Sequence, residues 1–509
     1  MKILRIGPLL VSSVILLALL LAGGCKESSS TQPQGQKPTI VSFLADPSSI
    51  VAGGDSVTLS WKVKNATSLS ISPGVGTVTP VDSGSIKVFV ASTTTFTLTA
   101  SNSSGDATST ATVSMGQTLT VNGYVKDIDG EPISGVTATV IIKGKTPVTT
   151  GADGSFSVPN VTAPYEARVI LSTAQTAIVY QGLTRSDPVL LYLGSTTTAK
   201  SATISGSVPV AAGKITLVFF ISDTKTWSTV ADQFAGTYEI DPSWKGSAVS
   251  YAGQLQVLRW TPNPNGLPSE YDAYGSRNLT ISDGGTFSNN NFLEADFTDP
   301  AEQNISGSII LPASGYDVSY KRLNINFGDA YVYLSGEFGA SLTDNFSYTV
   351  PSISGATFEV DVRASYSSRE TTYQKKGITG GSTGITITLA AAPQLNLPVN
   401  NGTGIDTTTQ FLWAQGGGTG VNLVLIVPSV PNGGPAFYMF TASNSTAIPN
   451  LGPLGLGLQS GIQYEWWVNR IFPVSTINDA ASDFFIPLIQ GNGGENGSVV
   501  SETFHFTTK

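Results

Sequence analysis

Short segments in which apolar and polar residues alternate run through most of this 509-residue chain. Two clear examples are residues 57–63 (VTLSWKV) and 95–100 (TFTLTA), and turn-forming Gly, Pro, Asn and Asp residues separate such segments. A period of two places successive side chains on opposite faces of a strand, which is typical of strands buried on one face. No stretch has the pattern of a long amphipathic helix. The sequence therefore predicts an all-β fold.

The composition agrees with this prediction and excludes several classes of partner. The chain has 54 Gly, 28 Pro and only 12% charged residues, which favours β-sandwich domains over helical bundles or coiled coils. Its net charge of -9 argues against binding to nucleic acid or to an anionic membrane surface, because both require clustered Lys and Arg. The length is enough for several domains, each with its own core.

The N-terminus has the layout of a secretory signal. Lys2 and Arg5 precede an apolar run over residues 9–22, which is too short to span a bilayer as a helix. The run ends in LAGGC at residues 21–25, and this string resembles the lipobox of bacterial lipoproteins. The resemblance implies that residues 1–24 are removed and that Cys25 carries the lipid. The alternative is an ordinary cleaved signal followed by an incidental cysteine.

Cys25 is the only cysteine, so the chain has no internal disulfide. Two or more acyl chains anchor a protein stably to a membrane. Lys26 follows the cysteine in place of the Asp that marks inner-membrane retention in Gram-negative lipoproteins, which favours the outer membrane of a bacterial cell envelope. Residues 25–37 are polar and are expected to form a flexible tether after the acylated cysteine.

Residues 38–116 form the first expected domain. The strings PSSIVAGGDSVTLSWKV, ATSLSISPGVGTV and TTTFTLTASNSSGDATSTATV resemble the immunoglobulin-like repeats of bacterial surface proteins, and they place Trp61 in the core.

Residues 117–198 form the second expected domain. The strings LTVNGYVKDIDGEPISGVTATVIIKG and TTGADGSFSVPNV are similar to the carboxypeptidase regulatory-like module, a transthyretin-like sandwich that is mostly an accessory module. Asp-Gly pairs at residues 129–130 and 153–154 supply its turns.

An internal repeat extends this assignment along the chain. ISGSV at residues 204–208 recurs as ISGSI at residues 305–309, a period of about a hundred residues. We therefore expect two divergent transthyretin-like sandwiches, over residues 199–300 and 301–391. Chance similarity between two Gly-rich β segments is the alternative, chiefly for the middle copy.

Residues 392–509 complete the expected series. The strings PQLNLPVNNGTGIDTTTQFLWAQ, GLQSGIQYEWWVNRIF and SETFHFTT resemble a fibronectin type III-like domain with Trp413 and Tyr464 in its core and Phe504 and Phe506 on its closing strand. The predicted fold is all-β, with tandem β-sandwich domains (immunoglobulin-like, transthyretin-like and fibronectin type III-like) after a lipoprotein signal peptide.

The chain offers little for catalysis. Its one histidine, His505, lies between two phenylalanines, and alternation predicts that it faces solvent. With one histidine and one acylated cysteine, we expect no metal and no cofactor. The cluster DIDGE at residues 127–131 could be a partial calcium loop, but a hairpin turn explains it better. A pair of carboxylates could still hydrolyse glycosides, although a sequence cannot place such a pair. We therefore predict that the protein is not an enzyme.

Aromatic side chains are the candidates for a ligand surface, because sugars stack on exposed rings. The candidates are Trp227, Trp244 and Trp260 in residues 199–300, and Tyr331 and Tyr333 on one face of a strand in residues 301–391. Core or cross-strand packing is the alternative for all five.

These observations lead to a functional hypothesis. The protein is expected to be a non-enzymatic, membrane-anchored envelope lipoprotein that uses its modules for binding or adhesion, with carbohydrate or another envelope protein as partner. The alternatives are an accessory, less plausibly catalytic, component of polysaccharide processing and a structural spacer in an envelope assembly.

Overall fold

The computed structural model describes residues 36–509, apart from positions 47, 51–53, 117, 172–174, 314, 431–432 and 492–493. The leader and Cys25 lie outside the described residues. The chain divides into two compact units, Met1–Met115 and Gly116–Lys509. Strands dominate both units, and the chain is an all-β protein of tandem β-sandwich domains. Within the described ranges, no helix has the length and apolar character needed to cross a membrane.

The first unit is a sandwich of two antiparallel sheets, with one parallel pair between β2 and β8. One sheet has the order β1-β3-β6 and the other β2-β8-β7-β4-β5. Trp61 lies in the core between them, and its indole N–H donates a 3.0 Å hydrogen bond to the Pro80 carbonyl. The strands are β1 (Thr39–Asp46), β2 (Ser49–Ile50), β3 (Asp55–Lys64), β4 (Ser68–Ser72), β5 (Gly76–Thr77), β6 (Ser83–Val90), β7 (Thr94–Asn102) and β8 (Gly105–Met115).

The second unit begins with three modules that share one strand order, here called the first, second and third modules (residues 117–198, 199–300 and 301–391). In each, a small sheet has a strand from the start of the module (β9, β17 or β25) in the centre, antiparallel to one neighbour and parallel to the other. These sheets are β12-β9-β15, β20-β17-β24 and β28-β25-β31. Their strands are β9 (Thr118–Lys126), β12 (Ser155–Thr162), β15 (Val189–Leu191), β17 (Thr203–Ser207), β20 (Thr237–Ile240), β24 (Thr286–Phe287), β25 (Glu302–Ile310), β28 (Asn345–Pro351) and β31 (Ile385–Thr388).

The second sheet of each module is a four-stranded antiparallel arrangement, again in one order: β11-β10-β13-β14, β19-β18-β22-β23 and β27-β26-β29-β30. The strands are β10 (Thr139–Ile142), β11 (Val148–Thr149), β13 (Tyr165–Leu171), β14 (Thr176–Leu183), β18 (Ile215–Ile221), β19 (Thr226–Val230), β22 (Ser250–Pro262), β23 (Pro268–Ser282), β26 (Asp317–Phe327), β27 (Ala330–Leu342), β29 (Ala356–Tyr366) and β30 (Arg369–Ile378). A short extra pair, β16 (Lys200–Ser201) with β21 (Ser243–Trp244), belongs to the second module.

The C-terminal domain (residues 392–509) has a sheet in the order β32-β34-β37 facing the strands β36, β35, β38, β39 and β40. Trp413 and Tyr464 are buried in its core, together with Phe506. Two short helices, α1 (Ile477–Ala480) and α2 (Phe485–Ile489), lie between β38 and β39. The strands are β32 (Gln394–Leu397), β33 (Gly402–Ile405), β34 (Gln410–Ala414), β35 (Val421–Pro428), β36 (Ala436–Thr441), β37 (Ser445–Ala447), β38 (Gln463–Phe472), β39 (Asn496–Val500) and β40 (Phe504–Thr508).

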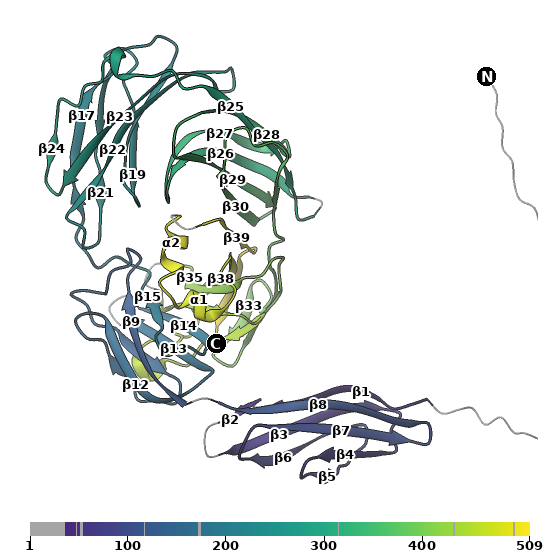
Figure 1. Ribbon diagram of the computed structural model, residues 1–509. Helices are drawn as coiled ribbons and strands as arrows, with labels where there is room; N and C mark the ends of the chain where they lie inside the picture. Colours follow the sequence, from purple (N-terminus) through teal and green to yellow (C-terminus); the bar gives the residue numbers. More distant parts are fainter. Residues whose placement is uncertain are drawn as a thin grey trace, which may run out of the picture. The chain divides into compact units, whose positions relative to one another are not determined.

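One continuous sheet runs through the first module, the C-terminal domain and the third module. Its central order is β13-β14-β36-β35-β38-β39-β30-β29. β14 pairs in parallel with β36, and β39 pairs antiparallel with β30. In Figure 1 the C-terminal strands β35 and β38 accordingly lie between the blue strands β13 and β14 and the green strand β30. The sequence predicted a series of separate sandwiches, whereas backbone hydrogen bonds join these three domains.

β14 shows how the junction is built. Ile178 and Tyr180 face the core of the first module, while Ala177 and Val179 face the core of the C-terminal domain. The strand is apolar on both faces because both faces are covered. Helices α1 and α2 add buried residues to the first module's core, although they belong to the C-terminal domain by sequence.

Candidate functional site

Two of the aromatic candidates lie in hydrophobic cores. Trp244 is 4% exposed and Trp260 is 2% exposed. Trp244 packs in the core of the second module, and Trp260 packs beside Tyr271 in a core shared by the second and third modules. A ring enclosed in this way has no face open to a ligand, so the prediction that these two tryptophans form a binding surface is corrected.

Trp227 is partly buried and is turned towards the same core as Trp244. Its ring stacks on Phe220 and meets Trp244 and Tyr251 edge to face, and its indole N–H donates to the Ser243 carbonyl at 3.1 Å. Its neighbours on β19, Thr226 and Ser228, line a cavity instead. Strand alternation therefore directs Trp227 away from that cavity.

Tyr331 and Tyr333 are placed differently. Both line the cavity bordered by Thr226 and Ser228, which has a volume of about 330 Å³. Val332, between them, is buried in the core of the third module. Tyr333 is 45% exposed, and Gln490, which follows helix α2, completes this part of the wall. The cavity thus combines two aromatic rings with hydroxyl and amide groups, and we call it the tyrosine cavity.

Polar side chains occupy the sheet beside Tyr331. Glu359 is fully buried and accepts hydrogen bonds from the side-chain amides of Asn324 at 3.0 Å and Asn326 at 3.3 Å. The ammonium of Lys376 lies 3.7 Å from the same carboxylate and 6.0 Å from the centre of the Tyr331 ring. Burial raises the pKa of Glu359, although Lys376 and the two amides oppose the effect.

Asp361, two residues along β29, is held by a second set of donors. Arg322 forms an ion pair with it and donates from Nε at 3.0 Å, and the Tyr320 hydroxyl lies 3.4 Å from its other oxygen. Burial raises the pKa of Asp361 against the opposing charge of Arg322, and burial raises the pKa of Tyr320 to about 12. Both carboxylates on β29 are paired and almost completely enclosed, so neither is positioned as an acid catalyst.

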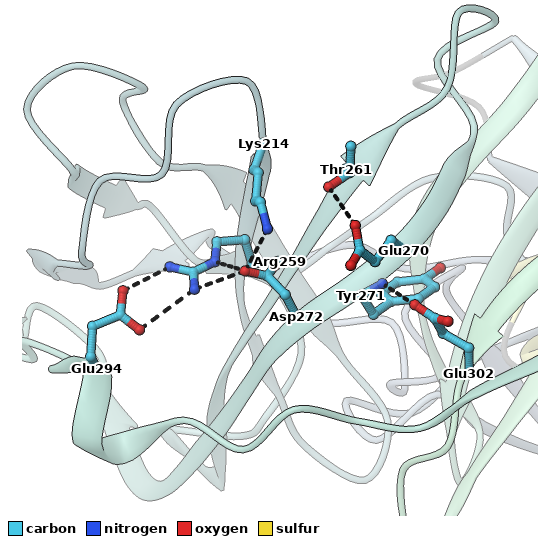
Figure 2. A network of polar contacts seen from close by, with 8 residues as sticks. All are labelled: Lys214, Arg259, Thr261, Glu270, Tyr271, Asp272, Glu294 and Glu302. Atoms are coloured by element: carbon cyan, nitrogen blue, oxygen red, sulfur yellow. Dashed lines mark hydrogen bonds and ion pairs between the residues drawn. The ribbon is translucent and has the colours of Figure 1, made fainter.

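A network of charged groups links β22, β23 and the segment around Glu294 within the second module (Figure 2). The Arg259 guanidinium lies between Asp272, at 2.9 Å, and Glu294, at 3.1 Å, and Lys214 adds a second ion pair to Asp272 at 2.9 Å. The backbone N–H of Tyr271, the residue before Asp272, donates a hydrogen bond to Glu302 of the third module. Among the contacts named here, the Tyr271–Glu302 hydrogen bond is the one that joins the second module to the third.

The remaining chemical candidates have structural roles or lie on the surface. His505 is partly exposed on β40, with Nε2 3.5 Å from Glu465. Asp127 is fully buried, and its carboxylate accepts from the backbone N–H groups of Asp129, Glu131 and Thr196. It therefore organises a turn. In the part of the chain that the structure describes, no group of three or more His, Cys, Asp or Glu could hold a metal ion.

Sequence reasoning missed Arg322, Asp361 and their neighbours. The signal was present as polar residues at alternate positions in three strands: RxNxN at 322–326, ExD at 359–361 and TxQxK at 372–376. Such alternation normally indicates a face in solvent. Here the face is partly covered by α2, which lies more than a hundred residues away in the sequence.

Comparisons with known proteins give distant structural neighbours. No family model matches the sequence, and no curated protein matches it. Among solved structures, the Bacillus anthracis TIE protein has 12% identity over 71% of this chain and 76% of its own, with a TM-score of 0.15. Two B repeat units of the collagen-binding protein of Staphylococcus aureus have 12% identity over 70% and 93%, with a TM-score of 0.13. Immunoglobulin domains 1–5 of Sidekick-1 have 10% identity over 93% and 98%, with a TM-score of 0.13. At such TM-scores the neighbours carry no argument about function.

Proposed function

We propose that the protein is a non-enzymatic lipoprotein of the bacterial cell envelope, anchored through Cys25, that binds carbohydrate at the tyrosine cavity. The observation that carries the proposal is the position of Tyr331 and Tyr333 on one face of β27, opposite Thr226 and Ser228 of β19. Aromatic rings stack on the C–H faces of sugars, and hydroxyl and amide groups hydrogen-bond to sugar hydroxyls. The lipid on Cys25 follows from the resemblance to the lipobox.

The setting of the cavity supports recognition over catalysis. Two carboxylates on β29 of the same sheet, Glu359 and Asp361, are both occupied by donors and have side-chain exposures of 0% and 2%. A glycoside hydrolase needs two carboxyl groups that reach the scissile bond. The two walls, β19 and β27, are in contact with each other without a ligand, which reduces the entropy lost on binding.

A glycan array tests the proposal directly. The probe is the mature chain, residues 25–509, with Cys25→Ser so that it is soluble and retains every described residue. Saturable binding to at least one glycan is expected, and Tyr333→Ala should weaken it about tenfold or more. Tyr124→Ala is the matched control, because Tyr124 is also 45% exposed but lies on β9 of the first module.

Two outcomes would contradict the carbohydrate proposal. In one, no glycan is bound while a single envelope protein copurifies with the chain, which would favour the protein-partner or spacer hypotheses. In the other, Tyr333→Ala and Tyr124→Ala bind equally well, which would place the sugar elsewhere on the protein.

A further inference from the structure

A second cavity, of about 440 Å³, lies on the continuous sheet where the C-terminal domain meets the third module. Its floor is formed by residues of β36, β35, β38, β39, β30, β29 and β26, which are consecutive neighbours in the sheet. Helix α2 and residues Leu191 and Leu193 form the rest of its wall. The two cavities share no lining residue, although Ile489 of this cavity is followed directly by Gln490 of the tyrosine cavity. Its volume is within the range of small-molecule sites.

The two ends of this cavity differ in character. At the C-terminal domain, the wall is formed by Leu423, Phe440, Phe485 and Leu488, each less than 10% exposed. At the third module, the wall is polar and includes Arg322, Asp361, Thr372 and Gln374. The wall changes from apolar to polar along one face of one sheet. At β35 and β36 this face packs on the core of the first module, whereas at β30, β29 and β26 it carries polar side chains.

Two side chains that line this cavity each carry an amide oxygen with no hydrogen-bond partner among the described residues. The two oxygens are Oε1 of Gln374 on β30 and Oδ1 of Asn469 on β38, and both atoms are buried. A buried amide oxygen without a partner costs free energy, and native proteins normally satisfy such groups. Both atoms are hydrogen-bond acceptors, so a ligand that satisfies them must supply hydrogen-bond donors.

The charge in this cavity is balanced. The Arg322 guanidinium and the Asp361 carboxylate lie in the polar wall and pair with each other. An anionic head group would meet unpaired amide oxygens and the Asp361 carboxylate, and a cationic head group would meet Arg322. A neutral group with hydroxyl donors fits all of these contacts, and the apolar end fits a hydrocarbon body.

We propose that this cavity binds a neutral amphiphile, with its hydrocarbon body against Leu423, Phe440 and Leu488 and its hydroxyl-bearing head donating to Gln374 and Asn469. The class includes small acyl- or alkyl-glycerols. The inference is independent of carbohydrate binding at the tyrosine cavity, because it uses other residues.

Radiolabelled 1-O-octylglycerol is the probe, measured by equilibrium dialysis below its micelle-forming concentration. The protein is residues 25–509 with Cys25→Ser, as for the glycan array. Saturable binding of one molecule per chain is expected. Glycerol, which lacks the hydrocarbon body, should not compete. Octanoate and octylammonium, which keep the body but carry opposite charges, should each bind at least tenfold more weakly than octylglycerol.

Variants locate the bound molecule. Ile489→Trp should fill the cavity and abolish binding, since Ile489 lines the cavity and is 40% exposed, so the larger ring can be accommodated at the surface. Phe484→Trp is the matched control, because Phe484 is the N-cap of α2, is 52% exposed and is not part of the cavity wall. Gln374→Leu should weaken binding about fivefold to tenfold while leaving the melting temperature unchanged or higher, because it removes an unpaired buried acceptor.

Three results would overturn the proposal: equal binding of octanoate or octylammonium, full binding by Ile489→Trp, or a loss of stability in Gln374→Leu with no loss of binding. The carbohydrate proposal is tested separately, because Tyr333→Ala should leave octylglycerol binding intact and Ile489→Trp should leave glycan binding intact. If Ile489→Trp does not fold, Gln374→Leu and the head-group series still decide the outcome.

Discussion

The ring of Phe156 lies directly across from Gly123, so close that a β-carbon on the glycine would stand 2.5 Å from the ring's Cζ. The same relationship holds in the other two modules. Gly206 is paired with Tyr238, and Gly307 with Phe346. At each site the parallel neighbour or the loop beside it also brings a backbone oxygen within 2.5 Å of the missing β-carbon. An aromatic residue packed over a strand glycine is thus a constraint common to all three modules.

Adding a methyl group at this position should destabilise the module that contains it. In Gly307→Ala, the new carbon would lie 2.1 Å from the Ile385 carbonyl oxygen and 2.6 Å from the Phe346 ring. Overpacking of this kind costs about 1–3 kcal/mol. Urea unfolding should show the lower midpoint. Gly494→Ala is the control, because no neighbouring atom lies within 4 Å of its added carbon. An equal fall in the urea midpoint of both variants would refute the packing argument.

This constraint explains why the repeat could be found from the sequence. The strings ISGSV and ISGSI fall on β17 and β25, the central strands of the small sheets, and the shared glycine is the one beneath the aromatic ring. Trp61, Trp413 and Tyr464 are buried, as the resemblance to immunoglobulin-like and fibronectin type III-like domains implied. Local patterns of this kind record packing within one module.

Contacts between modules left no comparable pattern. β14 was expected to belong to one sandwich, yet Val179 faces the core of the C-terminal domain. Trp260 was a candidate for a ligand surface because it is aromatic, but its ring lies in a core formed by two modules. The polar face around Arg322 and Asp361 looks solvent-exposed in sequence, because the residues that cover it come from α2. These features depend on pairings between distant segments, which a period of two cannot report.

The pairing of β14 with β36 should make the C-terminal domain sensitive to a change in the first module. Val179→Ala removes two methyl groups from the core that contains Phe411 and Trp466 and should cost about 1–3 kcal/mol. Hydrogen exchange should become faster in residues 421–428 and 463–472. Val57→Ala, an equally buried change in the other compact unit, should leave these segments unaffected. Unchanged exchange in Val179→Ala would show that the two domains are energetically independent.

Removal of Arg259 should destabilise the second module. The Arg259 side chain is only 8% exposed, and Arg259→Met leaves Asp272 with Lys214 alone and Glu294 without this partner. We expect a loss of about 1–3 kcal/mol, measured by urea unfolding. Lys375→Met is the control with the same change in charge, and it should cost less than about 1 kcal/mol because the Lys375–Glu495 pair is more exposed. Similar losses in the two variants would contradict a special role for the network.

The same network should make stability depend on pH in the acid range. Burial by itself raises the pKa of Asp272, but hydrogen bonds from Lys214 and Arg259 outweigh it and hold the pKa below its ordinary value of 3.8. A carboxyl group with a lowered folded-state pKa stabilises the protein above its unfolded-state pKa, and this contribution is lost as the pH falls through the folded-state value. The stability difference between the wild type and Arg259→Met should therefore shrink below about pH 4. A difference that is constant from pH 7 to pH 3 would show that Asp272 is not the group involved.

The proposed lipid anchor at Cys25 can be tested by a single substitution. Cys25→Ser removes the thiol that the lipobox resemblance assigns to the lipid, so incorporation of a labelled fatty-acid analogue should stop and the protein should leave the membrane fraction. Ser28→Ala, three residues further along the tether, should keep both the label and the membrane association. Retention of Cys25→Ser on the membrane would refute the anchor, because the acyl chains that would explain stable anchoring have no attachment site at residue 25 in this variant. Release would also supply, from the native envelope, the unanchored protein on which both binding proposals can be measured.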